Sequence, residues 1–184
     1  MRLREFLQRT TRTKRKVVRR KNSLCAQMNI IIQEIFMLKN IPSILPPILL
    51  KTLCEMGHGD SIVIADGNFP AESVGKNAIV IRMDGHGVPE ILEAILKLFP
   101  LDQYVEKPVA LMERCEGDNA DVSIWEKYKK ILKASGEGSA KSIRMLERFA
   151  FYDEAKKAYA VIATSETSQY ANVILQKGCI IQGK

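Results

Sequence analysis

Ser-Ile-Val-Ile-Ala at residues 61–65, followed by Asp66 and Gly67, is the stretch that decides the fold class. Its apolar, largely β-branched side chains predict a buried strand, and the Asp-Gly pair predicts the turn that ends it. Further strands are predicted at 78–82, 109–112, 142–147, 159–164 and 172–176. Helical patterns alternate with them, at 47–57, 89–99, 123–133 and 149–157. This alternation predicts a three-layer α/β domain with a largely parallel sheet.

The positive charge of the chain is concentrated at its N-terminus. Of 184 residues, 28 are Lys or Arg and 21 are Asp or Glu, which gives a net charge of +7. Residues 1–36 hold ten of the basic and two of the acidic side chains, whereas the other 148 residues hold 18 and 19. We therefore expect a basic, disordered N-terminal extension over 1–36 and a single α/β domain over 37–184. The extension is either native, a targeting arm, or sequence translated upstream of a start at Met37.

The nearly neutral domain and its few metal-binding side chains argue against several function classes. Without an extended positive field the domain cannot hold a polyanion, so any nucleic-acid affinity belongs to the extension. No apolar run approaches the ~20 residues that span a bilayer, and no membrane partner is expected. Four cysteines without a Cys-x-x-Cys pair, and only two histidines, indicate neither a zinc site nor a thiol-exchange site. We expect reduced thiols and a cytoplasmic location.

Polar side chains follow predicted strands, which is where open α/β sheets bind ligands. They are Asp66 after the first strand, Arg148 after the fourth, and Tyr170 and Asn172 after the fifth. Carboxylate, guanidinium, phenol and amide groups are those that bind sugar hydroxyls. The pattern indicates a carbohydrate site, while an Asp before a glycine is also a common turn former.

His58 stands in Gly-His-Gly-Asp at residues 57–60, between a predicted helix and a predicted strand. Imidazole exchanges protons near neutral pH, and the flanking glycines leave room for a ligand, so His58 is a candidate acid–base group. A histidine in such a loop is also commonly a surface or capping residue. We interpret His86, in a second turn, as a surface residue.

Seven short motifs carry a resemblance to a known family. They are Met-Leu-Lys at 37–39, Glu-Met-Gly-His-Gly-Asp at 55–60, Ala-Asp at 65–66 with Asn-Phe-Pro at 68–70, Pro-Leu-Asp at 100–102, Glu-Gly-Asp at 116–118, Arg-Phe-Ala-Phe-Tyr at 148–152, and Tyr-Ala-Asn at 170–172 with Ile-Leu at 174–175. In this order they resemble the L-fucose mutarotase / D-ribose pyranase family. The resemblance covers residues 37–180.

The resemblance implies a fold, an assembly and an activity. The fold is the α/β fold of this family, assembled as a ring-shaped homodecamer. The activity is that of an isomerase that interconverts cyclic forms of a free monosaccharide without a cofactor or metal. The implied site residues are His58 as proton donor, Asp66, Arg148, Tyr170 and Asn172 as sugar ligands, and Ala171 through its backbone.

Two features bear on which sugar is used. Arg148 in its motif and the helix around 125–130 resemble the fucose branch, whereas Tyr-Ala-Asn at 170–172 is closer to the ribose branch. Arg148 can touch sugar oxygens, whereas Ala171 differs by only a methyl group from the glycine that fucose enzymes often carry. We therefore favour an L-fucose mutarotase. D-ribose pyranase activity and a non-catalytic sugar-binding module remain the alternatives.

Ring opening needs a proton on the ring oxygen while the anomeric hydroxyl loses one. His58 is the predicted acid, and Asp66, Tyr170 or water is the partner that removes the anomeric proton. An extended strand over 61–65 separates His58 from Asp66 by up to ~26 Å, at about 3.3 Å for each of eight positions. A monosaccharide is far narrower, so we expect a neighbouring subunit to complete the site.

Overall fold

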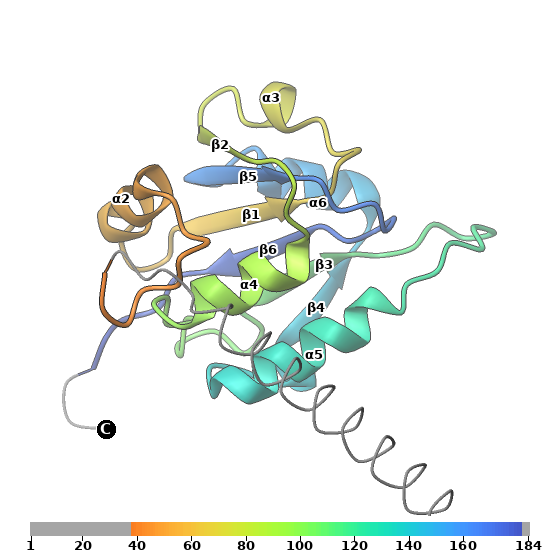
Figure 1. Ribbon diagram of the computed structural model, residues 1–184. Helices are drawn as coiled ribbons and strands as arrows, with labels where there is room; N and C mark the ends of the chain where they lie inside the picture. Colours follow the sequence, from red (N-terminus) through yellow and green to blue (C-terminus); the bar gives the residue numbers. More distant parts are fainter. Residues whose placement is uncertain (1–37, 182–184) are drawn as a thin grey trace, which may run out of the picture. The chain divides into compact units, whose positions relative to one another are not determined.

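A six-stranded sheet with the order β2-β5-β1-β6-β3-β4 organises residues 38–181, the part of the chain that the computed structural model describes (Figure 1). The prediction for residues 1–36 lies outside the described residues. The strands are β1 (Ser61–Ala65), β2 (Ile79–Met83), β3 (Val109–Met112), β4 (Ile143–Leu146), β5 (Ala160–Thr164) and β6 (Val173–Gln176).

Five of the six strands run in one direction, which confirms the prediction of a largely parallel sheet. Parallel pairs join β1 to β5, β5 to β2, and β3 to β4. β6 is antiparallel to both of its neighbours, β1 and β3. The beginning of β6 therefore lies at the same edge of the sheet as the carboxyl ends of the other strands.

Helices cover both faces of the sheet, so the predicted three-layer arrangement is also confirmed. One face packs against α2 (Pro47–Glu55), α4 (Val88–Leu96) and α5 (Ile124–Ser135), and the other against α3 (Ala71–Val74) and α6 (Arg148–Ala155). Ile62 and Ile64 belong to the first core, whereas Val63 and Ala65 belong to the second, because successive strand side chains point to opposite faces. Burial on both faces explains the unbroken apolar run of β1.

The predicted elements differ from the observed ones mainly at their ends. The strands at 61–65 and 109–112 are observed with the predicted bounds, and the strand predicted at 78–82 is displaced by one residue. The short helix α3 and a single 3₁₀ turn, Ala140–Ser142, were not predicted, because three or four residues are too few to show a helical period. Among residues 38–181, no helix combines the length and apolar character needed to cross a membrane.

The end of β6 holds two loops together at the edge opposite to the carboxyl ends. On one side, Gly59 N donates to Lys177 O at 2.9 Å and Lys177 N donates to Asp60 O at 2.8 Å. On the other side, Asp102 N donates to Gln176 O at 3.1 Å. The loop that contains His58 and the loop that contains Asp102 are thus fixed by the same short segment.

Gly178 makes this close approach possible, and we expect Gly178→Ala to lower the free energy of unfolding by about 1–3 kcal/mol. A Cβ at this position would overlap the backbone of Leu101 and Asp102. Gly57→Ala is the matched control, because a Cβ there meets no atom nearer than Asp60 Oδ2, at 3.7 Å. Urea denaturation measures both variants. Equal stability of Gly178→Ala and the wild type would contradict this packing.

Candidate functional site

The carboxyl edge of the sheet contains a cavity of about 350 Å³. Four of the six predicted site residues line it: Asp66, Arg148, Tyr170 and Asn172. The other lining residues are Asn68, Phe69, Met112, Asp118, Tyr152 and Gln169. The topology explains the convergence, because β1 and the helix α6 deliver residues to the edge at which β6 begins.

Asp66 and Asn172 form a reciprocal pair at the base of this cavity. Asp66 N donates to Asn172 Oδ1 at 2.9 Å, and Asn172 Nδ2 donates to Asp66 Oδ2 at 2.8 Å. Both side chains are buried, with exposed fractions of 5% and 4%. Both ends of the Asn172 amide are therefore in contact with Asp66, and Asn172 fixes the orientation of the carboxylate.

Burial raises the pKa of the Asp66 carboxyl above its ordinary value. Hydrogen bonds act in the opposite direction without cancelling this effect, among them the one that Asn68 N donates to Asp66 Oδ1 at 3.0 Å. Each carboxylate oxygen can accept more than one hydrogen bond. Asp66 thus retains acceptor capacity for a ligand hydroxyl, and its raised pKa makes it a better base than an ordinary aspartate.

Tyr170 is held at the rim by its backbone and by its hydroxyl. Its backbone has a positive φ of 54°, and its carbonyl accepts a hydrogen bond from Trp125 Nε1 at 2.9 Å. Its hydroxyl donates to Asp118 Oδ2 at 2.6 Å. This hydrogen bond raises the pKa of Tyr170 to about 12 and lowers the pKa of Asp118. A neutral phenol that donates its hydrogen to Asp118 can accept from a ligand, but it is a poor base.

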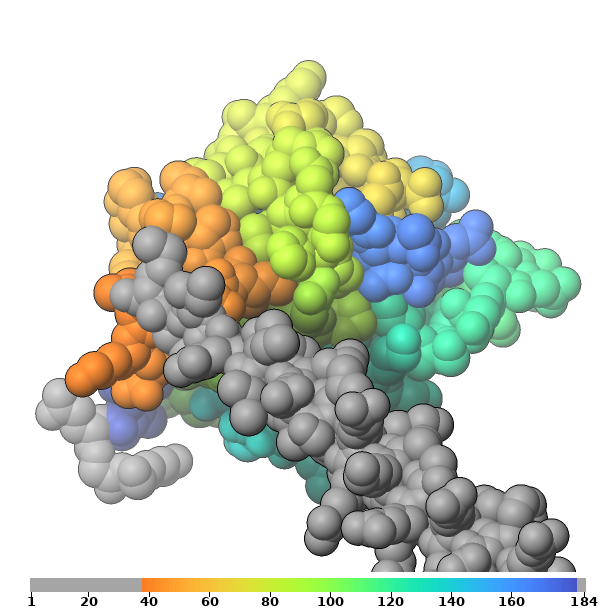
Figure 2. Space-filling model, in the orientation of Figure 1, coloured from red at the N-terminus to blue at the C-terminus, as the bar shows by residue number. Residues whose placement is uncertain are grey.

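The loops that carry Asp118 and Tyr170 lie at one side of the molecule. Figure 2 shows residues 113–123 in teal beside residues 165–171 in blue. Sequence reasoning missed Asp118 as a site residue. Its Glu-Gly-Asp motif was part of the resemblance, but nothing in the sequence linked that motif to Tyr170, 52 positions away.

Arg148 supplies a positive charge to the cavity from the first residue of α6. Its guanidinium carbon lies 5.8 Å from the centre of the Tyr152 ring, and hydrogen bonding to Tyr152 raises the pKa of Arg148 further above its ordinary value. Tyr152, another lining residue that sequence reasoning missed, therefore supports Arg148 from within the same Arg-Phe-Ala-Phe-Tyr motif. A guanidinium held in this way can donate to two ligand oxygens.

Ala171 is buried and does not line the cavity. Its carbonyl accepts a hydrogen bond from the buried Tyr128 hydroxyl at 2.8 Å, while its N–H lowers the pKa of Asp66. In this chain the Ala171 backbone therefore supports Asp66 and α5.

His58 lies at the opposite edge of the sheet and does not line the 350 Å³ cavity. Its Nε2 lies 3.1 Å from Asp102 Oδ1, and its ring meets the Tyr104 ring edge-on, with the two centres 5.4 Å apart. The His58 side chain is 45% exposed. The structure thus separates His58 from the other predicted site residues, as the length of β1 requires.

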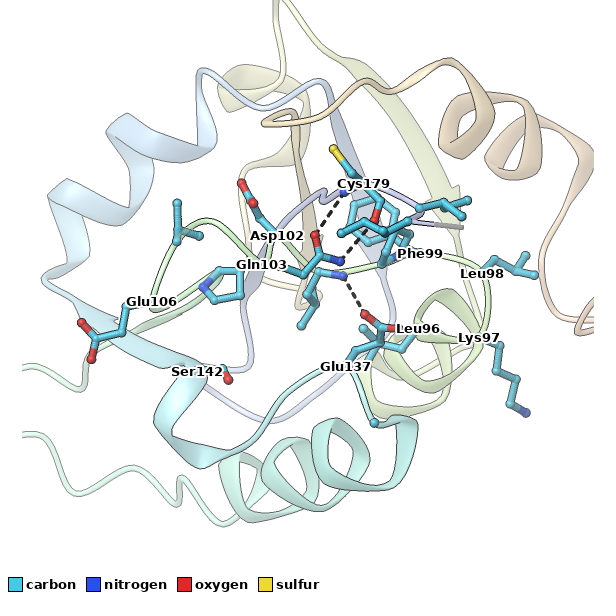
Figure 3. A pocket seen from close by; sticks show the side chains of 17 residues that line it. Leu96, Lys97, Leu98, Phe99, Asp102, Gln103, Glu106, Glu137, Ser142 and Cys179 are labelled. Atoms are coloured by element: carbon cyan, nitrogen blue, oxygen red, sulfur yellow. Dashed lines mark hydrogen bonds between the residues drawn. The ribbon is translucent and has the colours of Figure 1, made fainter. Parts of the chain in front are cut away.

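A larger cavity of about 600 Å³ lies at the His58 edge (Figure 3). Its lining surface is about half polar and half apolar, and several of its polar groups already bind one another. Gln103 exchanges two hydrogen bonds with the Cys179 backbone, and Glu137 accepts from Leu101 N at 3.0 Å. None of the six predicted site residues lines it, although Asp102 does. The smaller cavity, with its convergent charged and polar groups, is therefore the better ligand site.

The fold and the site define an α/β protein that presents polar side chains around a ligand cavity at the carboxyl edge of its sheet. The sequence profile of the RbsD / FucU transport protein family matches residues 39–180. The chain therefore belongs to this family.

Relatives with names and solved structures agree with this assignment. The fucose mutarotase of Homo sapiens is 48% identical over 147 residues, which cover 78% of this chain and 94% of that protein. The crystal structure of FucU from Bifidobacterium longum is 63% identical, covers 78% of this chain and all of that one, and has a TM-score of 0.76. A fucose mutarotase from Streptococcus pneumoniae, in complex with L-fucose, is 48% identical with the same coverage and a TM-score of 0.73.

The opposite pKa directions at Asp66 and Asp118 predict the order in which the two carboxyls titrate. Asp66 should titrate above the ordinary value of 3.8 and Asp118 below it. The stabilisation linked to Asp66 is full below its ordinary pKa and is lost as the pH rises through the raised pKa. That linked to Asp118 is present above its ordinary pKa and is lost as the pH falls. Carboxyl ¹³C NMR titration measures both, and a reversed order would disprove the electrostatic description.

Proposed function

We propose that this chain is an L-fucose mutarotase, an isomerase that interconverts the α and β anomers of free L-fucose. The observation that carries the proposal is the buried Asp66–Asn172 pair, with Arg148 and Tyr170 around one cavity of monosaccharide size. Two of the relatives described above are named as fucose mutarotases, and the structure of one of them contains L-fucose. Arg148 supports fucose over ribose in this chain.

The reaction requires two proton transfers. His58 donates a proton to the ring oxygen while the bond between that oxygen and the anomeric carbon breaks. A base takes the proton of the anomeric hydroxyl. The oxygen of that hydroxyl becomes the carbonyl oxygen of the open chain. We assign the base to Asp66, because the raised pKa of a buried carboxyl suits this role and the Tyr170 hydrogen is already donated to Asp118. Reclosure on the other carbonyl face gives the second anomer.

His58 and Asp66 lie at opposite edges of the sheet within one subunit, so they cannot contact one sugar together. We therefore propose that His58 of a neighbouring subunit completes each cavity. The resemblance to the L-fucose mutarotase / D-ribose pyranase family implies that this assembly is a homodecameric ring. The exposed thiols of Cys54 and Cys115 support a cytoplasmic location, where thiols stay reduced.

Saturation-transfer NMR with purified protein tests the reaction. We expect exchange between the anomer signals of L-fucose, and a fall of at least about 100-fold in its rate for His58→Ala, because a positioned general acid contributes on that scale. His86→Ala is the matched control and should retain the wild-type rate, since His86 lies outside the cavity and pairs with Glu90. An unchanged rate for His58→Ala would sink the assignment. Faster exchange of ribose than of fucose would favour the pyranase alternative, and sugar binding without exchange a non-catalytic module.

Mixing two inactive variants tests whether the site is shared. His58→Ala and Asp66→Ala subunits each lack one half of the chemistry, so a mixed assembly should contain some sites with both groups intact. We expect partial recovery of exchange after subunit exchange, which mass spectrometry of the intact assembly verifies. No recovery in a verified mixture would show that each site comes from a single chain.

A further inference from the structure

Beneath His58 lies a buried carboxylate that the reaction above does not use. The exposed fraction of Asp102 is 4%, and its Oδ1 lies 3.1 Å from His58 Nε2. The imidazole is nearly half exposed, so one side of the ring contacts Asp102 and the other is open to a ligand. A buried carboxylate needs hydrogen-bond donors, and the imidazole is one of the donors at this edge.

The backbone fixes the distance between the two side chains. The loop of His58 and the loop of Asp102 are both bonded to residues 176–178 at the end of β6, one on each side. Asp102 also accepts at Oδ1 from Tyr104 N at 2.9 Å and at Oδ2 from Gln176 Nε2 at 3.3 Å. The carboxylate thus accepts two hydrogen bonds before the imidazole is counted.

The hydrogen-bond inventory assigns the hydrogen on the ring. An ionised carboxylate can only accept hydrogen bonds, so His58 Nε2 must carry a hydrogen when it bonds to Asp102. Within residues 38–181, Nδ1 of His58 has no hydrogen-bond partner. The edge-on contact with the Tyr104 ring restricts rotation of the imidazole.

We infer that Asp102 is a positioning residue that makes Nδ1 the proton-donating atom of His58, an inference that rests on the proposed mutarotase function. In the imidazolium, Nε2–H stays bonded to Asp102 while Nδ1–H faces the sugar ring oxygen. Transfer of the Nδ1 proton leaves neutral imidazole with hydrogen on Nε2, which is the tautomer that Asp102 stabilises. No tautomer change is then needed before Nδ1 takes up a proton again. Asp102 acts through His58 and does not itself contact the sugar.

The two histidines allow a direct test, because the chain contains no others. His86 contacts a carboxylate through its other ring nitrogen: His86 Nδ1 lies 3.3 Å from Glu90 Oε1, whereas His58 uses Nε2. In the neutral state we expect ¹⁵N magic-angle-spinning NMR to show hydrogen on Nε2 for His58 and on Nδ1 for His86. His86→Ala assigns the signals by removing one set. Hydrogen on Nδ1 of neutral His58 would overturn the inference.

Asp102→Asn tests the effect on catalysis. The amide oxygen can still accept from Tyr104 N and from His58 Nε2, which both bond to Oδ1, so the turn and the tautomer are retained while the negative charge that orients the imidazolium is lost. We expect kcat for fucose exchange to fall about 10- to 100-fold, the scale of a misplaced catalytic group, with KM changed less than about threefold. Glu90→Gln, which removes the charge beside the other histidine, is the matched control and should keep the wild-type kcat. Urea denaturation checks that both variants fold.

The outcomes separate this inference from the proposed function. If the wild type exchanges fucose and folded Asp102→Asn keeps its kcat, the positioning role is wrong and the function stands. A parallel loss of stability and of both kinetic constants would show that Asp102 is merely structural, which also overturns the inference. If the wild type exchanges no sugar, the proposed function fails, while the ¹⁵N measurement still decides the hydrogen position on His58.

Discussion

The register of β1 against the antiparallel β6 is the constraint on which the rest of the structure depends. Ile64 pairs with Val173 at one end of this ladder and Ser61 with Gln176 at the other. Since the two buried faces of β1 carry side chains of different size, Ile62 and Ile64 on one and Val63 and Ala65 on the other, a shift by one residue would disrupt the packing on both faces. The same register sets Asp66 beside Asn172 at one edge and brings the His58 loop to Lys177 at the other. One strand pair thus positions both groups of the proposed proton transfers.

Two buried carboxylates at the opposite edges of the sheet are handled in the same way. Asn172, directly before β6, donates to Asp66, and Gln176, the last residue of β6, donates to Asp102. Each carboxylate also accepts backbone N–H groups from the turn that follows it, from Asn68 and Tyr104 respectively. These donors offset the free-energy cost of burying charge, and they leave each carboxylate able to accept a further hydrogen bond. β6 is therefore a central strand that also positions two buried aspartates, one at each of its ends.

The sequence was sufficient for the fold and for half of the site. Burial on both faces gives β1 and β3 an unbroken apolar pattern, so both were predicted with their observed bounds, and the rule that ligands collect at carboxyl ends brought Asp66, Arg148, Tyr170 and Asn172 together. Asp102 and Asp118 could not be assigned roles in this way. Their contacts with His58 and Tyr170 span 44 and 52 positions, and no local pattern encodes such pairing. The strand length alone was enough to separate His58 from Asp66.

The charges that line the 350 Å³ cavity bear on whether it suits a neutral sugar or a sugar phosphate. Two carboxylates, Asp66 and Asp118, face a single guanidinium from Arg148. A neutral polyol can supply hydroxyl hydrogens to these acceptors, whereas the phosphate ester of the same sugar would bring two further negative charges against them. The site therefore favours the unmodified monosaccharide. The proposed anomer exchange therefore acts on the sugar before any phosphate is added to it.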